Sequence, residues 1–242
     1  MFKGVSYVVR ENVRNLYRIY SIAKYELLAD MRDSKLGIFW NFANPVIQVA
    51  TYWFVFGFVF KRNEIDGVDF LSWLLGGMVI WFFISPCITT VVLKEAFNHL
   101  CLMLIVVVLF AINGHYPSLH WFGLIYYFIC SILFSISLSL TTSVLNMLAR
   151  DTRKLILACM RLLMYLTPIL WDIKLLPHTL QIIMKLNPIY YLVCGYKDCF
   201  FFHEGILFYW KQMLVFWVWT IGLFWIGSVI MYKFRTKFMD LI

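Results

Sequence analysis

Charged residues in the second half of the chain follow one another at helical spacing. The series consists of Arg150, Lys154, Arg161 and Asp172. Its steps of four, seven and eleven residues bring side chains to one side of a helix. Arg161 would lie roughly 15 Å along that helix from Arg150. Because a planar guanidinium donates hydrogen bonds in pairs to phosphate oxygens, the series predicts a cationic path for an anionic group such as a pyrophosphate.

Arg161 also has a simpler interpretation. If the helix enters the membrane later in the sequence, the long side chain only extends its guanidinium to the inner surface. A cation held inside a membrane is costly, and it usually faces a cavity or a partner. The sequence leaves both interpretations open.

The elements that must position these residues are membrane helices. Hydrophobic residues make up 62% of the 242 residues and charged residues 14%, whereas a typical soluble domain is about half apolar and a quarter charged. Several uncharged runs approach the roughly 20 residues that cross a bilayer as a helix. The runs are continuous and do not alternate as in a strand barrel. We therefore predict an all-α polytopic membrane protein.

The distribution of apolar and basic residues divides the chain into two regions. Residues 1–35 should form a cytoplasmic amphipathic helix at the membrane interface, because an apolar stripe at steps of three and four runs beside a basic one. Residues 36–242 should form a six-span transmembrane domain. We expect its spans at about 39–60, 70–93, 99–112, 121–148, 155–173 and 212–232.

Two connections depart from simple loops. The stretch 174–211 is too polar to span and too apolar for a plain loop, so we expect short re-entrant outer helices broken at Pro177 and Pro188. Before the short third span there is only LKEAFNHL (93–100). Either the bilayer thins there or a segment between about Val92 and Leu100 is lacking.

Basic residues set the expected orientation. Lysine and arginine are concentrated in segments 3–35, 150–154 and 233–237, and such residues collect at the cytoplasmic ends of spans. We therefore place both termini in the cytoplasm and the chain in the cytoplasmic membrane. The same rule explains the net charge of +8 without nucleic acid.

The sequence gives no sign of catalysis. It contains no GxxxxGK[ST] nucleotide-binding loop and no HExxH or GxSxG motif. Its five histidines lack metal-ligand spacing, so we expect no catalytic residue, metal or cofactor in this chain. The six cysteines form no CxxC pair. The sequence does not decide whether Cys194 and Cys199 form a disulfide.

Three motifs, in order along the chain, resemble those of type-2 ABC transporter permeases that export polysaccharides and polyol phosphates. SKLGIFWNFANPVIQ (34–48) is similar to the LGxxWxxxxP pattern by which an interfacial helix turns into the first span. ARDTRKL (149–155) resembles the turn between spans four and five. NPIYYLVCGYKDCFF (187–201) resembles the outer segment before the last span. The first motif supplies Leu36, Gly37, Trp40 and Pro45.

The resemblance implies a permease subunit that works as a homodimer with two separate ATPase subunits, which bind the ATP and Mg. Such permeases move a polymer linked to an undecaprenyl-pyrophosphate-type lipid, and the wall teichoic acid exporters are the most similar. Exporters of O-antigen or capsular polysaccharide are the alternative. A drug exporter, or a membrane enzyme acting on lipid-linked sugars, is a weaker one.

Two sets of candidate residues follow. For the substrate path we expect Arg161, Trp40, Asn44, Tyr165, Trp171 and Asp172. For contact with the ATPase we expect Arg10, Arg14, Arg18, Arg150, Asp151 and Lys154. The family also places a cytoplasmic coupling helix between spans two and three, and LKEAFNHL is too short to hold it.

Overall fold

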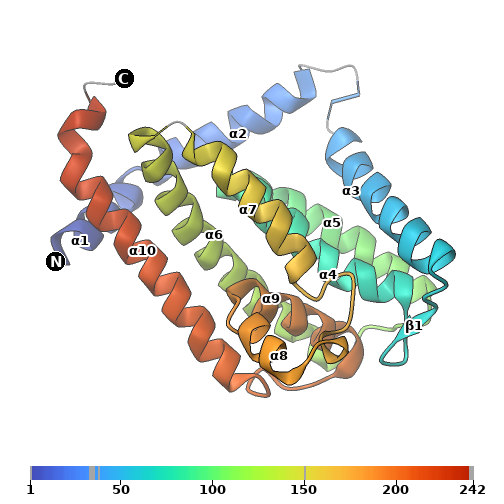
Figure 1. The fold of residues 1–242 in the computed structure, drawn as a ribbon. Coiled ribbons are helices and arrows are strands. Elements are labelled where there is room, and N and C mark those ends of the chain that lie inside the picture. The colour runs from blue at the N-terminus through green and yellow to red at the C-terminus, as the bar shows by residue number, and fades with distance from the viewer. Residues whose placement is uncertain (1, 33–35, 38, 150, 240–242) are drawn as a thin grey trace.

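The computed structural model describes residues 2–32, 36–37, 39–149 and 151–239, and these residues are almost entirely helical (Figure 1). The α-helices are α1 (Phe2–Arg14), α2 (Leu16–Arg32), α3 (Phe39–Tyr52), α4 (Phe70–Ile84), α5 (Val92–Ile112), α6 (Gly123–Leu148), α7 (Thr152–Leu166), α8 (His178–Lys185), α9 (Pro188–Lys197) and α10 (Trp210–Met239). Short 3-10 or π turns are η1 (Trp53–Val59), η2 (Pro86–Ile88), η3 (Leu119–Phe122), η4 (Ile173–Leu175) and η5 (Asp198–Phe202). One small antiparallel hairpin pairs β1 (Glu64–Ile65) with β2 (Val68–Asp69).

Five helical segments of the described residues are long and apolar enough to cross a membrane, so the prediction of an all-α polytopic protein is confirmed. They are Phe39–Val59, Phe70–Ile88, Val92–Ile112, Leu119–Leu148 and Trp210–Thr236. The expected span 155–173 is not among them. Its helix, α7, has 15 residues and reaches about 22 Å. It ends at Leu166 because Thr167 precedes a proline and is extended, as a residue in that position prefers.

The expectation of a short third span is wrong. The stretch LKEAFNHL lies inside α5, which begins at Val92 and has 21 residues. The connection from α4 to α5 is correspondingly brief, with the single turn η2 before Thr89. Within residues 85–91 the structure therefore holds no helix longer than that turn.

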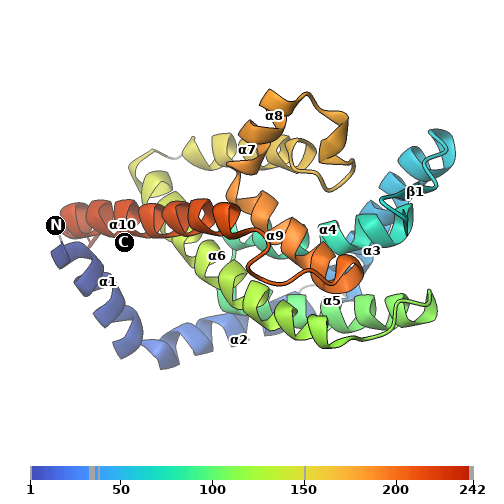
Figure 2. The same cartoon turned by 90° about the horizontal axis from the view of Figure 1, so that it is seen from below.

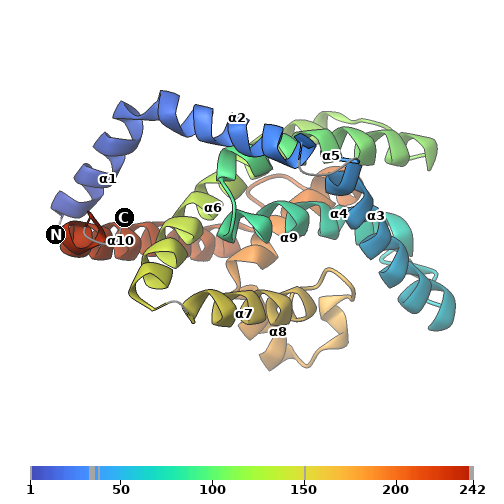
Figure 3. The same cartoon turned by 90° about the horizontal axis from the view of Figure 1, so that it is seen from above.

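The helices are arranged in three layers (Figures 2 and 3). The pair α1 and α2, with α5 beside α2, lies on one side of a middle layer that contains α4, α9 and α10, and the pair α7 and α8 lies on the other side. Helix α4 is central, with 67% of its most apolar stretch buried, against 6% for the first span, α3 with η1. The first span is thus the least covered of the five.

The N-terminal amphipathic region is two helices, where one was expected. They meet at Asn15, and both Asn12 and Asn15 donate side-chain hydrogen bonds to backbone carbonyls one turn earlier, at 2.8 and 2.7 Å. Such bonds compete with regular helix geometry. Between α2 and α3, Gly37 has a φ of 42°, a conformation that glycine adopts without steric cost. This is the predicted bend from the surface helix into the first span.

The segment before α10 forms short helices, as expected, and prolines mark their starts. Pro177 caps α8 and Pro188 is the first residue of α9. Lys197, at the end of α9, donates to the Pro168 carbonyl at 2.8 Å, and its Nζ lies 3.5 Å from the centre of the Trp73 ring. These contacts tie α9 to α4 and to the end of α7. The thiols of Cys194 and Cys199 are both free.

The segments rich in basic residues lie at one end of the body. Figure 1 shows both chain ends, α2 and the α6–α7 turn there, with the β-hairpin and α8 at the opposite end. This arrangement agrees with the predicted shared side for the termini. The assignment of that side to the cytoplasm, and the division at residue 35, stay predictions.

Candidate functional site

A cavity of about 730 Å³ opens among α3, α4, α5 and α7. We call it the polar cavity, because amide, hydroxyl and charged side chains share its wall with aromatic ones. The polar and charged lining residues are Asn41, Asn44, Gln48, Tyr52, Ser85, Thr89, Lys94, Glu95, Asn98, His99, Arg161 and Tyr165. Its location among membrane-spanning helices makes it the candidate functional site.

The α5 wall comes from the stretch that we expected to be a loop. Lys94, Glu95, Asn98 and His99 all line the polar cavity. Their spacing, two neighbouring residues repeated four positions later, is that of one helical face. This spacing is a sequence signal for one helical face, but the charges in the run favour a connection between spans. These four residues were therefore not among the predicted path residues.

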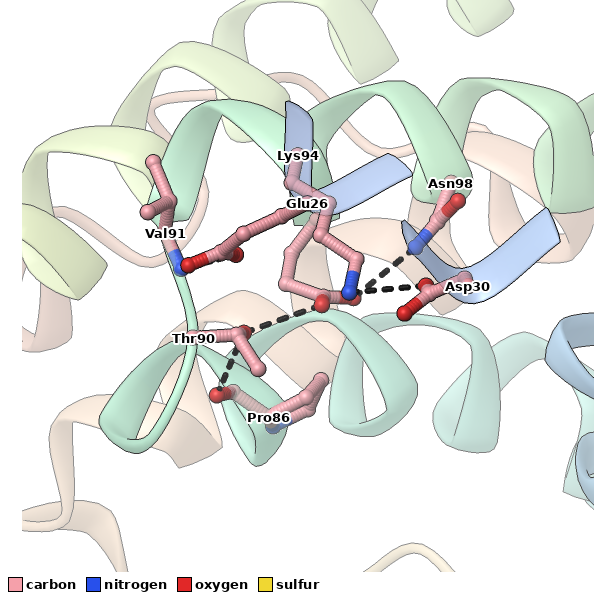
Figure 4. A network of polar contacts seen from close by, with 8 residues as sticks. Glu26, Asp30, Pro86, Thr90, Val91, Lys94 and Asn98 are labelled. Atoms are coloured by element: carbon pink, nitrogen blue, oxygen red, sulfur yellow. Dashed lines mark hydrogen bonds and ion pairs between the residues drawn. The ribbon is translucent and has the colours of Figure 1, made fainter. Parts of the chain in front are cut away.

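Hydrogen bonds hold the α5 wall in place. The Glu95 carboxylate accepts from the Thr90 hydroxyl at 2.9 Å and from the Asn98 amide at 3.2 Å. The Thr90 O–H is shared between this carboxylate and the Pro86 carbonyl, which lies 2.9 Å from the hydroxyl oxygen and joins the wall to η2 (Figure 4). Among the described residues, the side-chain amide oxygen of Asn98 is buried without a hydrogen-bond partner.

Helix α2 reaches the same wall from outside the cavity. The Nζ of Lys94 lies 2.7 Å from the Asp30 carboxylate, and the backbone N–H of Val91 donates to the Glu26 carboxylate at 3.4 Å (Figure 4). Acidic side chains near the first residues of a helix are favourable, because that end carries partial positive charge. Two carboxylates one turn apart on α2 thus dock the surface helix onto the start of α5.

His99 is fixed deeper in the wall. It is 3% exposed, and its Nε2 lies 3.0 Å from the hydroxyl of Tyr196 on α9. Its ring stacks on Phe128, with centroids 5.2 Å apart and planes 15° apart. Because residues of α6 and α9 both hold this imidazole of α5, it gives the cavity a rigid inner surface.

The α3 wall carries two of the predicted residues, Trp40 and Asn44. Trp40 is 42% exposed, which suits an aromatic side chain at a membrane interface. Beside them the Asn41 amide nitrogen is buried and has no hydrogen-bond partner among the described residues. Pro45, the seventh residue of α3, has no N–H for the carbonyl of Asn41. This wall therefore offers polar groups to a bound molecule.

The α7 wall carries Arg161 and Tyr165, so four of the six predicted path residues meet in one cavity. Arg161 is exposed, and within the described parts of the chain no carboxylate lies at ion-pair distance from it. A guanidinium without a counter-ion is suited to a phosphate.

The other two predicted path residues, Trp171 and Asp172, do not line the polar cavity. The indole of Trp171 donates to the Tyr165 carbonyl at 2.8 Å, and the Asp172 carboxylate accepts from the Lys174 N–H at 3.0 Å. Both follow the break at Pro168, so the expectation that Asp172 shares a helical face with Arg161 is wrong. Helical spacing holds only while the helix continues.

The predicted ATPase-contact residues lie on the end of the body that carries the termini. Arg10, Arg14 and Arg18 are exposed on α1 and α2, and Asp151 and Lys154 are exposed at the start of α7. The 3.9 Å pair between Asp151 and Lys154 is almost fully solvated and adds little stability. Arg150 lies outside the described residues. The role of this set stays a prediction.

Within the described residues, no three histidine, cysteine or acidic side chains lie together. Comparison with known proteins points to membrane transport. Residues 90–201 match the family described as ABC-2 type transporter. This range includes the α5 and α7 walls of the polar cavity.

Curated relatives match most of the chain. An "O-antigen export system permease protein RfbA" of Klebsiella pneumoniae is 25% identical, with 91% of this chain and 93% of the relative covered. A second Klebsiella protein of that name is 23% identical over the same shares. One from Myxococcus xanthus is 22% identical, with 79% of this chain and 85% of the relative covered. These names agree with the alternative of O-antigen export and give no specific support to wall teichoic acid.

Proposed function

We propose that this ABC-2 type permease is the membrane-spanning subunit of an exporter for a lipid-linked, O-antigen-like polysaccharide. The chain itself is a permease and not an enzyme. ABC-2 permeases pair with ATPase subunits in exporters, so ATP and Mg belong to that partner. The protein resides in the membrane as a multi-pass chain.

The observation that carries the proposal is the polar cavity with an unpaired guanidinium at its wall. The guanidinium of Arg161 recognises the phosphate groups of a lipid-linked polymer by paired hydrogen bonds. Trp40 and Tyr165 supply aromatic faces beside it, and Asn41 and Asn44 supply amides. A polymer of sugars on a lipid pyrophosphate needs this combination of cation, aromatic surface and amide.

The second copy predicted for the permease would pack against the first span. Its apolar side chains Val46, Phe54 and Phe58 are each more than half exposed. The first span and α7 both line the polar cavity, and the first span is the least buried of the five, so a second copy against it would extend the wall around a conduit. We propose a homodimer with two ATPase subunits on the face that carries the termini.

The test is ATP hydrolysis by the permease together with the ATPase subunit that co-purifies with it, in nanodiscs. Arg161→Leu should reduce the hydrolysis stimulated by a polyprenyl pyrophosphate more than the basal hydrolysis. Arg161→Lys should lie between the two, because an ammonium keeps the charge but loses the paired donors. Lys211→Leu, which removes an exposed cation outside the cavity, serves as the control. Equal changes in stimulated and basal hydrolysis for Arg161→Leu would remove Arg161 from the substrate path.

A further inference from the structure

Lys94 takes part in two sites. Its side chain lines the polar cavity, yet its Nζ is held 2.7 Å from Asp30 of α2 (Figure 4). The Lys94 side chain is 9% exposed and that of Asp30 is 32% exposed. The cation is therefore inside the wall, while its counter-ion belongs to a helix that contacts the wall from outside.

The counter-ion moves only with α2. Glu26, one turn before Asp30, accepts the backbone N–H of Val91, so both carboxylates hold the start of α5 from one face of α2. Most other residues of α2 are exposed or half-buried. The docked position of α2 therefore depends strongly on these two polar contacts. Removing α2 from α5 would break both contacts together.

The charge of the polar cavity depends on that docking. Its wall carries two formal cations, Lys94 and Arg161, and one acid, Glu95. With α2 docked, Asp30 neutralises Lys94, so Arg161 and Glu95 cancel in formal charge. With α2 displaced, Lys94 has lost its counter-ion and the wall gains one positive charge. A buried cation without a partner is costly, so displacement favours the arrival of a new anion.

We propose that Lys94 is a second cationic ligand for the phosphate of the transported lipid, and that Asp30 of α2 occupies it until α2 undocks. The inference rests on the proposed function, since it assigns a further residue and its control to the same cavity. Binding and docking are then reciprocal: an anion that favours undocked α2 is itself bound more tightly when α2 is undocked, by the same factor. The surface helix thereby senses the cavity through one shared cation.

Binding to the whole permease in neutral phosphatidylcholine nanodiscs tests the proposal. The probes are a polyprenyl pyrophosphate and the uncharged polyprenol of equal length. Asp30→Asn should strengthen pyrophosphate binding by about threefold to tenfold and leave polyprenol binding unchanged. Lys94→Gln should weaken pyrophosphate binding, and adding Asp30→Asn to it should give no gain. Asp66→Asn is the matched control, because it breaks a 2.6 Å pair with Lys174 outside the cavity lining.

An exchanged pair separates binding from simple docking. Asp30→Lys combined with Lys94→Asp recreates the attraction between α2 and α5 but puts a carboxylate in the cavity wall. We expect the exchange to restore thermal stability relative to Lys94→Gln without restoring pyrophosphate binding. Recovery of both properties, or an Asp30→Asn protein that binds like wild type, overturns the proposal. If wild type itself binds pyrophosphate and polyprenol equally and Arg161→Leu changes nothing, the proposed function fails as well.

Discussion

The buried pair between His99 and Tyr196 allows a direct test of how the outer segment supports the polar cavity. Tyr196→Phe removes the hydroxyl that lies 3.0 Å from Nε2 of His99 and leaves the ring nitrogen buried. An unsatisfied buried polar group destabilises a protein by about 1–3 kcal/mol. For a chain of this size that corresponds to roughly 2–10 °C in melting temperature.

The double variant gives the result that separates hydrogen bonding from packing. In His99→Phe with Tyr196→Phe, no polar group of the pair is left unsatisfied, and a phenyl ring takes the place of the imidazole that already contacts Phe83 and Phe128. Replacing both partners by apolar groups of similar shape is close to neutral. We therefore expect the double variant to lose less stability than the two single variants added together, by about 1 kcal/mol or more.

Thermal unfolding of the permease in one detergent, followed by intrinsic fluorescence and by aggregation, measures the four proteins of this cycle. Tyr116→Phe is the control, because Tyr116 is 74% exposed and its hydroxyl is accessible to water. Its melting temperature should equal that of wild type. Strictly additive losses in the cycle would refute the reasoning, since they would mean that the two side chains do not interact.

Three further outcomes are expected. Gly195→Ala should destabilise the protein by about 1–3 kcal/mol or more in thermal unfolding, because its Cβ would overlap the carbon atoms of the buried Tyr127 ring and force them to shift; Gly222→Ala in α10, where a Cβ meets nothing within 4 Å, should be neutral or stabilising, and equal effects would contradict this packing. Asn187→Ala should lower stability by about 1–2 kcal/mol, because its carboxamide caps α9 and donates to Thr167 at 3.0 Å; a loss under half that size would argue against the cap. An epitope tag at the N-terminus should be protected from added antibody in intact cells, and labelling there would overturn the orientation.

The sequence determined the class of fold through hydrophobic length. The length of a continuous apolar run predicts whether a segment enters a membrane. Five helices long and apolar enough to cross a membrane therefore lie close to their predicted ranges. Prolines and glycine also predict local geometry, because their allowed backbone angles do not depend on contacts with the rest of the fold. Pro188 begins α9 and Gly37 has positive φ. Pro168 carries the same kind of signal, because the residue before a proline disfavours a helical conformation, and α7 ends at Leu166.

The candidate site was only partly accessible from the sequence. Helical spacing placed Arg161 and Tyr165 on one helix, but it could not tell which helix faces them. Trp40 and Asn44 were named as path residues, and the fold brings them to the same cavity. Asp172 was misplaced because spacing says nothing once a helix has ended.

Only the tertiary structure decided what the polar residues at the start of α5 do. Hydropathy treats Lys94 and Glu95 as reasons to end a span, since it counts the cost of a charge without its partners. In the fold, Asp30 neutralises Lys94 across 64 positions of sequence, while Thr90 and Asn98 satisfy Glu95. A charge is tolerated inside a membrane protein when a distant side chain meets it, and distance in the sequence does not reveal that meeting.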